Sequence, residues 1–263
     1  MDMRPCSVAG MFYPAEPRHL EQLLETFFQK KKAPGIDARG IVSPHAGYVY
    51  SGETSACAFS TIPPDFDGTL VVIGPSHRGY MTCASAVPWE TPLGIVDVDT
   101  KFVDALDIDI DEVSHRNEHS IEVQMPIIKY RFPRARVAPV MMGDQRYEAA
   151  TSLAERLLRA IGHTGRNVRI VASSDFSHYV PGETARRQDL YAIDALTTLD
   201  VPEFYRRLQE TGATACGYGP IAAMCIACRS LGAERGELLR YTTSGDVTGD
   251  FNQVVGYAAI AVV

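Results

Sequence analysis

Six short apolar runs that alternate with amphipathic segments constrain the fold of this chain more than any other feature. They are rich in Val, Ile and Leu, are bounded mainly by Gly, Pro and Ser, and cover residues 38–44, 68–75, 136–143, 168–174, 237–245 and 254–263. Runs of this length are typical of strands, and several are apolar almost throughout, as in a sheet covered on both faces. The pattern predicts a sheet with helices packed against it.

Helical periodicity separates several of these runs. In the segment HLEQLLETFFQKK, Leu and Phe recur at i, i+3, i+4, i+7 and i+8 from Leu20 to Phe28, which predicts a helix with one buried stripe. Residues 183–199 and 202–211 repeat this pattern, and residues 219–231 are apolar nearly all round. No helix is predicted between the last two strands, which favours an antiparallel pair. We therefore expect an α/β fold with a mixed central sheet flanked by helices.

Composition and charge limit the domain count and the partners. The 263 residues are 46% hydrophobic and 22% charged, and no linker, charge block or repeat divides them, so we expect one domain over residues 1–263. A net charge of -7 argues against a nucleic-acid partner, because phosphate binding requires clustered Lys and Arg. The one basic cluster, Lys30–Lys32, is expected to be the solvated end of a helix.

The N-terminal residues and the cysteines favour a cytoplasmic location. No long apolar region follows the early charges, so no signal peptide is predicted. No stretch reaches the ~20 apolar residues that a membrane span requires, so no membrane partner is expected. The six cysteines are accordingly expected to be reduced thiols, mostly small buried groups.

Three histidines lie a few residues beyond the ends of three predicted strands. His45 follows GIVSP, His77 follows TLVVIGPS and His178 follows RIVASSDFS. Because loops at the ends of strands build the ligand crevice in open α/β sheets, these imidazoles are expected to converge. Asp175 precedes His178 by three residues and could orient its imidazole, as in an acid/base pair, or could cap local backbone N–H groups.

Cys216 is the cysteine that the sequence singles out for chemistry. It stands in CGYGP just before the apolar helix, where the helix dipole is expected to lower the thiol pKa. A thiolate there could bind a soft metal or attack a carbonyl. Cys225 and Cys228 form a CxxC inside the same helix but lack a second pair, so core packing is expected for both.

One short string invites a different interpretation. HRNEH, residues 115–119, matches the H-x-x-E-H pattern of inverted zinc peptidases. The residues that follow it, SIEVQMPIIKY, have helical periodicity, so we interpret the string as a helix N-terminus with Ile121, Met125 and Ile128 facing the core. His115 is expected to lie outside the metal site, whereas His119 is close enough in sequence to this helix start to reach the pocket.

Eight segments resemble, in the same order, the motifs of the Memo proteins: RPCSVAGMFYP, PHAGYVYSG, GPSH, PLGIVDVD, EHSIEVQMP, SSDFSHY, CGYGP and SGDVTGDFNQVVGYAA. This family includes the mammalian mediator of cell motility and component B of the AmmeMemoRadiSam set of bacteria and archaea. The resemblance covers nearly the whole chain. It implies a single Memo-like domain similar to the class III extradiol dioxygenases, which are non-haem iron enzymes that cleave catechol rings.

The resemblance also implies a metal site. By it, His45, His77 and Cys216 occupy the metal-ligand positions, while Asp175 and His178 line the same pocket, with His178 at the position of the acid/base histidine. The dioxygenases use a carboxylate where this chain has Cys216. Since a thiolate favours softer ions, Fe(II) and Cu(I) are the expected metals, and Zn(II) stays open. The resemblance further implies work beside a radical-SAM enzyme.

Three kinds of function follow from these residues. The first is a metal-dependent redox enzyme that takes O2 or a small phenol-like ligand at an open coordination position, with His178 moving protons. The second is a module that holds a metal or a peptide in the same cleft and catalyses nothing. The third is an amide hydrolase with Cys216 as nucleophile and His178 or His45 as base.

Overall fold

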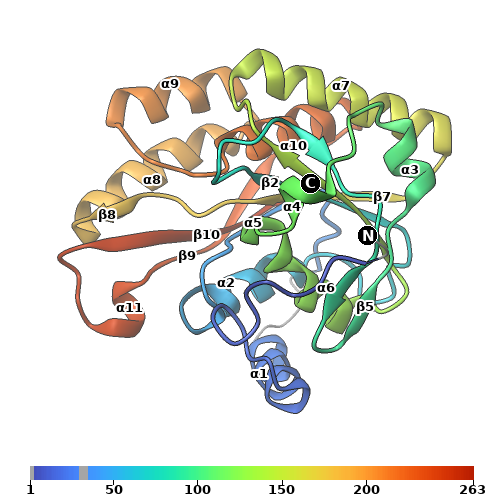
Figure 1. The fold of residues 1–263 in the computed structure, drawn as a ribbon. Coiled ribbons are helices and arrows are strands. Elements are labelled where there is room, and N and C mark those ends of the chain that lie inside the picture. The colour runs from blue at the N-terminus through green and yellow to red at the C-terminus, as the bar shows by residue number, and fades with distance from the viewer. Residues whose placement is uncertain (1–2, 30–34) are drawn as a thin grey trace.

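A mixed sheet flanked by helices forms the centre of the molecule (Figure 1). The computed structural model describes residues 3–29 and 35–263, so the predicted helix end at Lys30–Lys32 lies outside the described residues. The strands of the main sheet are β1 (Gly40–Ser43), β2 (Thr69–Pro75), β3 (Cys83–Ala84), β6 (Arg136–Met142), β7 (Val168–Ser173), β8 (His178–Val180), β9 (Gly236–Thr243) and β10 (Val254–Val262). A separate hairpin pairs β4 (Trp89–Thr91) with β5 (Gly94–Val96).

The helices come from segments between these strands. Their bounds are α1 (Pro17–Gln29), α2 (Tyr48–Phe59), α3 (Thr100–Ala105), α4 (Glu112–His115), α5 (His119–Glu122), α6 (Gln124–Arg131), α7 (Tyr147–Thr164), α8 (Gly182–Leu196), α9 (Val201–Thr211), α10 (Tyr218–Ser230) and α11 (Gly245–Thr248).

The order of strands in the main sheet brings the predicted site loops together. The order is β3-β6-β2-β7-β1-β10-β8, with β9 paired to β10. The four neighbours β6, β2, β7 and β1 are parallel, whereas β10 runs antiparallel to β1, β8 and β9. Parallel neighbours end at the same edge of a sheet, so the loops after β2, β7 and β1 leave side by side. This confirms the mixed α/β architecture and the antiparallel final pair.

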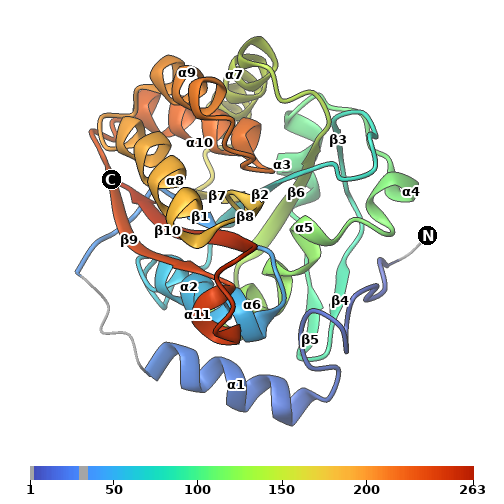
Figure 2. The same cartoon turned by 90° about the vertical axis from the view of Figure 1, so that its left-hand side faces the viewer.

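Helices cover both faces of the sheet, as Figures 1 and 2 show. Helices α1, α2 and α6 lie on one side, and α7, α8, α9 and α10 lie on the other. The strands between these layers are buried along nearly their whole length, as their apolar sequences predicted. On one face of the sheet α10 packs on β7 and β1, and on the other face α2 packs on β1 and β10.

The structure corrects three details of the sequence prediction. The linker before β10 contains the one-turn helix α11, although no helix was expected there. The helical segment after His115 is divided at Val123 into α5 and α6, although Ile121, Met125 and Ile128 are fully buried as predicted. Helices α2 and α7 were not predicted.

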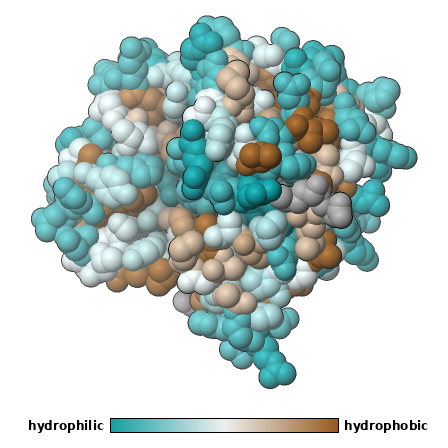
Figure 3. Space-filling view, in the orientation of Figure 1, coloured by the Kyte–Doolittle hydropathy of each residue, from teal (hydrophilic) through white to brown (hydrophobic). Residues whose placement is uncertain are grey.

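One face of the molecule is mainly hydrophilic. On the face drawn in Figure 3, hydrophilic residues cover most of the area and apolar groups are scattered among them. Among the described residues, no helix combines the length and the apolar composition needed to cross a membrane. No disulfide joins any of the six cysteines, all of which lie in the described part of the chain, and Cys225 and Cys228 are fully buried in α10.

Candidate metal centre

His45 is held in one tautomer by a buried hydroxyl. It follows β1 by two residues, is 1% exposed, and its Nδ1 lies 2.9 Å from Ser173 Oγ at the end of β7. The Ser173 hydroxyl donates its single hydrogen to the Ser120 carbonyl at 2.6 Å and accepts a hydrogen bond from Gln124 Nε2 at 2.8 Å. Ser173 must therefore accept from the His45 ring, which places the proton on Nδ1 and leaves the Nε2 lone pair free.

The electrostatic surroundings keep His45 neutral. Burial, and then the neighbouring imidazoles of His119 and His77, lower the pKa of His45 well below its ordinary value. A neutral imidazole with a free Nε2 is the form that binds a transition metal.

His77 is oriented by a buried carboxylate from the start of α5. Glu118 Oε2 accepts the backbone N–H of His77 at 2.8 Å, and Oε1 lies 2.9 Å from His77 Nδ1. Burial raises the pKa of Glu118, but the hydrogen bonds from the His77 ring and the Ser120 N–H, together with the charge of His77, outweigh burial and lower it to about 2. Because an ionised carboxylate only accepts, His77 carries a hydrogen on Nδ1, so Nε2 is the ring atom that it can offer to a metal.

A missing side chain at Gly74 lets α5 approach β2 closely. A Cβ there would lie 2.5 Å from Ser120 Oγ, which donates to the Pro75 carbonyl at 2.9 Å. The Glu118 carboxylate therefore reaches the loop after β2 only because Gly74 leaves room for the first turn of α5.

Cys216 reaches the same point from the loop between α9 and α10. Its Sγ lies 3.2 Å from His45 Nε2 and 3.2 Å from the Asp175 N–H. The following Gly217 permits this approach, since a Cβ there would lie 2.3 Å from the Ser173 carbonyl oxygen. The backbone N–H of Cys216 donates to the Asp175 carbonyl at 3.1 Å, so the loop is bonded to the end of β7.

The expectation of a lowered pKa for the Cys216 thiol is wrong. Burial, and then the charge of Asp175, raise this pKa. The thiol therefore donates to the free Nε2 of His45. Metal binding would release this proton, as it does at other thiolate sites.

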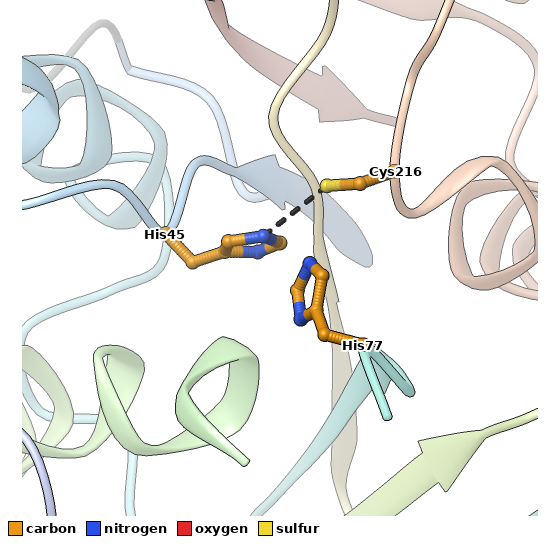
Figure 4. A group of neighbouring side chains, drawn as sticks. All are labelled: His45, His77 and Cys216. Atoms are coloured by element: carbon orange, nitrogen blue, oxygen red, sulfur yellow. Dashed lines mark hydrogen bonds between the residues drawn. The ribbon is translucent and has the colours of Figure 1, made fainter. Parts of the chain in front are cut away.

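The three residues form a compact donor set. His45, His77 and Cys216 each offer one ligand atom, and these atoms all lie within 4.8 Å of one another. Figure 4 shows the ring of His77 directed toward His45 and Cys216. The three residues come from three different loops. Of the three strand-end histidines that were expected to converge, His45 and His77 therefore lie together, and Cys216 joins them from another loop, whereas His178 is not part of this group.

Asp175 and His178 lie beside this set but do not pair with each other as their spacing suggested. Asp175 Oδ1 accepts the backbone N–H of His45, 130 positions away, at 2.8 Å, which differs from the local capping considered for it, and burial raises its pKa to about 6. His178 Nδ1 lies 3.0 Å from the Thr214 carbonyl, and its backbone N–H donates to Thr214 Oγ1. The tautomer of His178 is thus set by the loop that carries Cys216.

Sequence reasoning missed Glu118 and understated His119. The His119 ring stacks on His77 with centroids 4.5 Å apart and lies 5.4 Å from the His45 centroid. His77, Glu118 and His119 form a second group whose ligand atoms lie within 4.8 Å of one another. The signal was the Glu-His pair in HRNEH, which was set aside together with the peptidase pattern. His115 itself packs on Trp89 and points to the Cys83 carbonyl, outside both groups, as predicted.

Comparison with known proteins finds close relatives along the whole chain. Residues 4–261 match the family model of Memo-like proteins. A MEMO1 family protein of Methanococcoides burtonii is 46% identical over 266 residues, covering 99% of this chain and 100% of that protein. A MEMO1 family protein of Archaeoglobus fulgidus is 45% identical over 263 residues, covering 98% of each chain.

One solved structure overlaps more distantly. An uncharacterized protein of Escherichia coli K12 has a TM-score of 0.49 and 14% sequence identity, with 85% of this chain and 99% of that chain covered. This degree of overlap carries no functional argument.

Proposed function

Because the chain belongs to the family of Memo-like proteins, and because two imidazoles and one thiol converge at the ends of its parallel strands, we propose that it binds a transition metal through His45, His77 and Cys216. The observation that carries the proposal is the state of the two imidazoles. Ser173 and Glu118 each accept a hydrogen bond from Nδ1, so each ring offers Nε2 as its ligand atom. This arrangement of outer partners is typical of metal-ligating histidines.

The donor chemistry fits a metal of intermediate or soft character. Two imidazole nitrogens and one thiolate suit Fe(II), Cu(I) and Zn(II), and the thiolate favours Cu(I) over harder ions. The separation of 3.2 Å between Cys216 Sγ and His45 Nε2 is close to that of two ligands sharing one metal with bonds of about 2.0–2.3 Å. Three protein ligands leave further coordination positions for a small molecule.

The resemblance to extradiol dioxygenases supports a redox role for this site. A bound Fe(II) or Cu(I) would supply one-electron chemistry and a binding position for O2. Around it, His178 is available to hold or move a proton at Nε2, since its Nδ1 is bonded to Thr214. Which reaction is catalysed, and whether a radical-SAM enzyme acts beside this protein, stay predictions from the resemblance.

A phenol-like ligand stays a prediction from the resemblance, and two exposed tyrosines near Tyr257 are candidates to contact it. Tyr50 lies in α2 shortly after His45 and is 41% exposed, and Tyr179 directly follows His178 and is 72% exposed. Both lie close enough to Tyr257 to affect its ionisation: burial, then the charges of Asp175, Tyr50 and Tyr179, raise the pKa of Tyr257.

Substitution of Cys216 tests the proposal. Cys216→Asp recreates two histidines and a carboxylate, so Fe(II) binding should persist while Cu(I) affinity falls by well over ~tenfold. Cys216→Ala should weaken both. The measurement is anaerobic titration of each folded variant against competing chelators, with Cys6→Ala as a matched control outside the site. Affinities that do not respond to Cys216 would refute the metal proposal.

The same variants separate the other two functions. A non-catalytic metal module would bind metal in the same Cys216-dependent way but show no turnover with O2 and phenols. A cysteine nucleophile would use the Cys216–His45 contact directly, and its alkylation rate would be unchanged when metal is removed. Metal that protects Cys216 from alkylation would exclude that alternative.

A further inference from the structure

The carbonyl of Cys216 is held by a side chain from the opposite side of its loop. Gln145, in the connection between β6 and α7, donates through Nε2 to the Cys216 carbonyl at 2.8 Å. Its Oε1 accepts the backbone N–H of Gly219 at 2.9 Å, in the first turn of α10. One amide thus bridges the residue that carries the thiol and the helix that follows it, which a carboxylate or a shorter side chain could not do.

Gln145 is itself fixed in place. Its backbone carbonyl accepts a hydrogen bond from the Tyr205 hydroxyl at 2.7 Å, and the Tyr205 ring packs edge-to-face on Tyr147 and Tyr218. A Cβ at Gly219 would lie 2.8 Å from Gln145 Cβ, so the two backbones meet at close range. Because the backbone of Gln145 is fixed, its side-chain amide can hold the Cys216 carbonyl and the Gly219 N–H in defined positions.

Two further hydrogen bonds of the backbone hold the loop around Cys216 in place. The backbone N–H of Cys216 donates to Asp175, and the Gly217 N–H donates to Ser174 Oγ at 2.9 Å. Both of these partners belong to the segment after β7. Gln145 reaches the loop from a different segment, the connection between β6 and α7. Its hydrogen bond therefore opposes rotation of the loop about the bonds to Ser174 and Asp175.

We propose that Gln145 is a positioning residue that holds Cys216 at the distance from His45 and His77 required for metal binding. This inference rests on the proposed metal site. Gln145 does not touch the metal position, so it acts on affinity only through Cys216. Outer partners of metal ligands typically contribute ~10–100-fold in affinity, and we expect Gln145 to lie in this range.

Two substitutions separate its two hydrogen bonds. Gln145→Glu keeps an acceptor for the Gly219 N–H but loses the donor to the Cys216 carbonyl, whereas Gln145→Ala loses both. Gln209→Glu is the matched control, because Gln209 is exposed, lies near Tyr205 and Thr214, and would carry the same added charge. We expect Cu(I) affinity to fall by ~10–100-fold in both Gln145 variants and to change little in the control.

A double-mutant cycle with Cys216→Ala tests the route of action. If Gln145 acts through Cys216, Gln145→Ala should have no further effect on metal affinity in the Cys216→Ala background. The absorption of a bound Co(II) probe gives a second readout, since its thiolate charge-transfer band should weaken or shift in Gln145→Glu while the protein stays folded.

The outcomes distinguish the two proposals. Equal metal affinity of the wild type and Cys216→Ala would refute the metal site itself, and the positioning role with it. A Cys216-dependent site that is indifferent to Gln145→Ala and Gln145→Glu would refute only the positioning role. Losses that add in the double variant would show a general structural effect and would also overturn it.

Discussion

At the scale of single residues, the two imidazoles of the candidate centre are held by chemically different partners. His77 donates to the ionised Glu118, whereas His45 donates to the neutral hydroxyl of Ser173. A carboxylate partner raises the basicity of the ring and its strength as a ligand more than a hydroxyl does. His77 is therefore expected to depend more strongly on its partner than His45 does.

Replacing Glu118 by Gln tests this dependence. The variant keeps the shape of the side chain but loses the charge that holds the His77 Nδ1 proton, so Fe(II) and Zn(II) affinities should fall by ~10–100-fold. Chelator competition measures the change. Glu112→Gln is the control, since Glu112 accepts from Ser85 and Ala86 away from the imidazoles. Unchanged affinity would mean that Glu118 only shapes the loop.

At the scale of elements, the N-terminal segment is tied to α5 by a buried ion pair. Arg4 Nη1 lies 2.7 Å from Glu122 Oε2, and both side chains are at most 1% exposed. Arg4 also donates to the carbonyls of His115 and Glu118 and lies over the Trp89 ring. The RPCSVAGMFYP segment thereby supports the turn that carries Glu118.

Glu122 accepts hydrogen bonds from several residues of this segment. Its carboxylate accepts the N–H groups of Ser7 and Val8, the Ser7 hydroxyl, and the Tyr13 hydroxyl at 2.7 Å. Burial raises the pKa of Glu122, but Arg4 and these hydrogen bonds outweigh burial and lower it. The carboxylate is therefore ionised in the folded protein near neutral pH.

Glu122→Gln should destabilise the protein in a pH-dependent way. Removing one member of a buried pair leaves Arg4 uncompensated, which costs about 3–5 kcal/mol near neutral pH. Because the folded pKa is lowered, the contribution of the carboxylate is present above the unfolded value of 4.5 and is lost as the pH falls through the folded value. Denaturant unfolding of both proteins should show the difference shrinking below about pH 4.5. A difference independent of pH would contradict this.

At the scale of the whole molecule, α10 joins the candidate centre to the core. It begins two residues after Cys216 and then packs on β7 and β1 with its apolar side chains, where a Cβ at Gly40 would lie 2.8 Å from Met224 and Cys228. Displacement of this helix would therefore change the position of the thiol.

Cys225→Asp should disturb folding and not the metal chemistry directly. Cys225 is fully buried, and a carboxylate there must be desolvated or protonated. We expect a loss of several kcal/mol in the free energy of unfolding, measured by denaturant titration. Ser230→Asp, at the exposed end of the same helix, should cost no more than about 1 kcal/mol. Equal stability of the two variants would contradict the packing argument.

The sequence by itself determined six strands of the main sheet and the buried faces of several helices, and its resemblance to the Memo proteins picked out the three residues that meet. These signals are local: apolar runs and helical periodicity mark the elements, and His45, His77 and Cys216 stand at recognisable positions beside them. Helix α7 has such a pattern and was overlooked, whereas β3 and β8, of two and three residues, are too short to produce one.

Only the tertiary structure decided how the site is held and charged. The strand order β2-β7-β1 brings His45 to Ser173, 128 positions away, and His77 to Glu118, 41 positions away. No local pattern encodes such pairings. The protonation of Cys216 was likewise mispredicted, because a thiol pKa depends on burial and on the charge of Asp175, and both arise only when distant segments pack together.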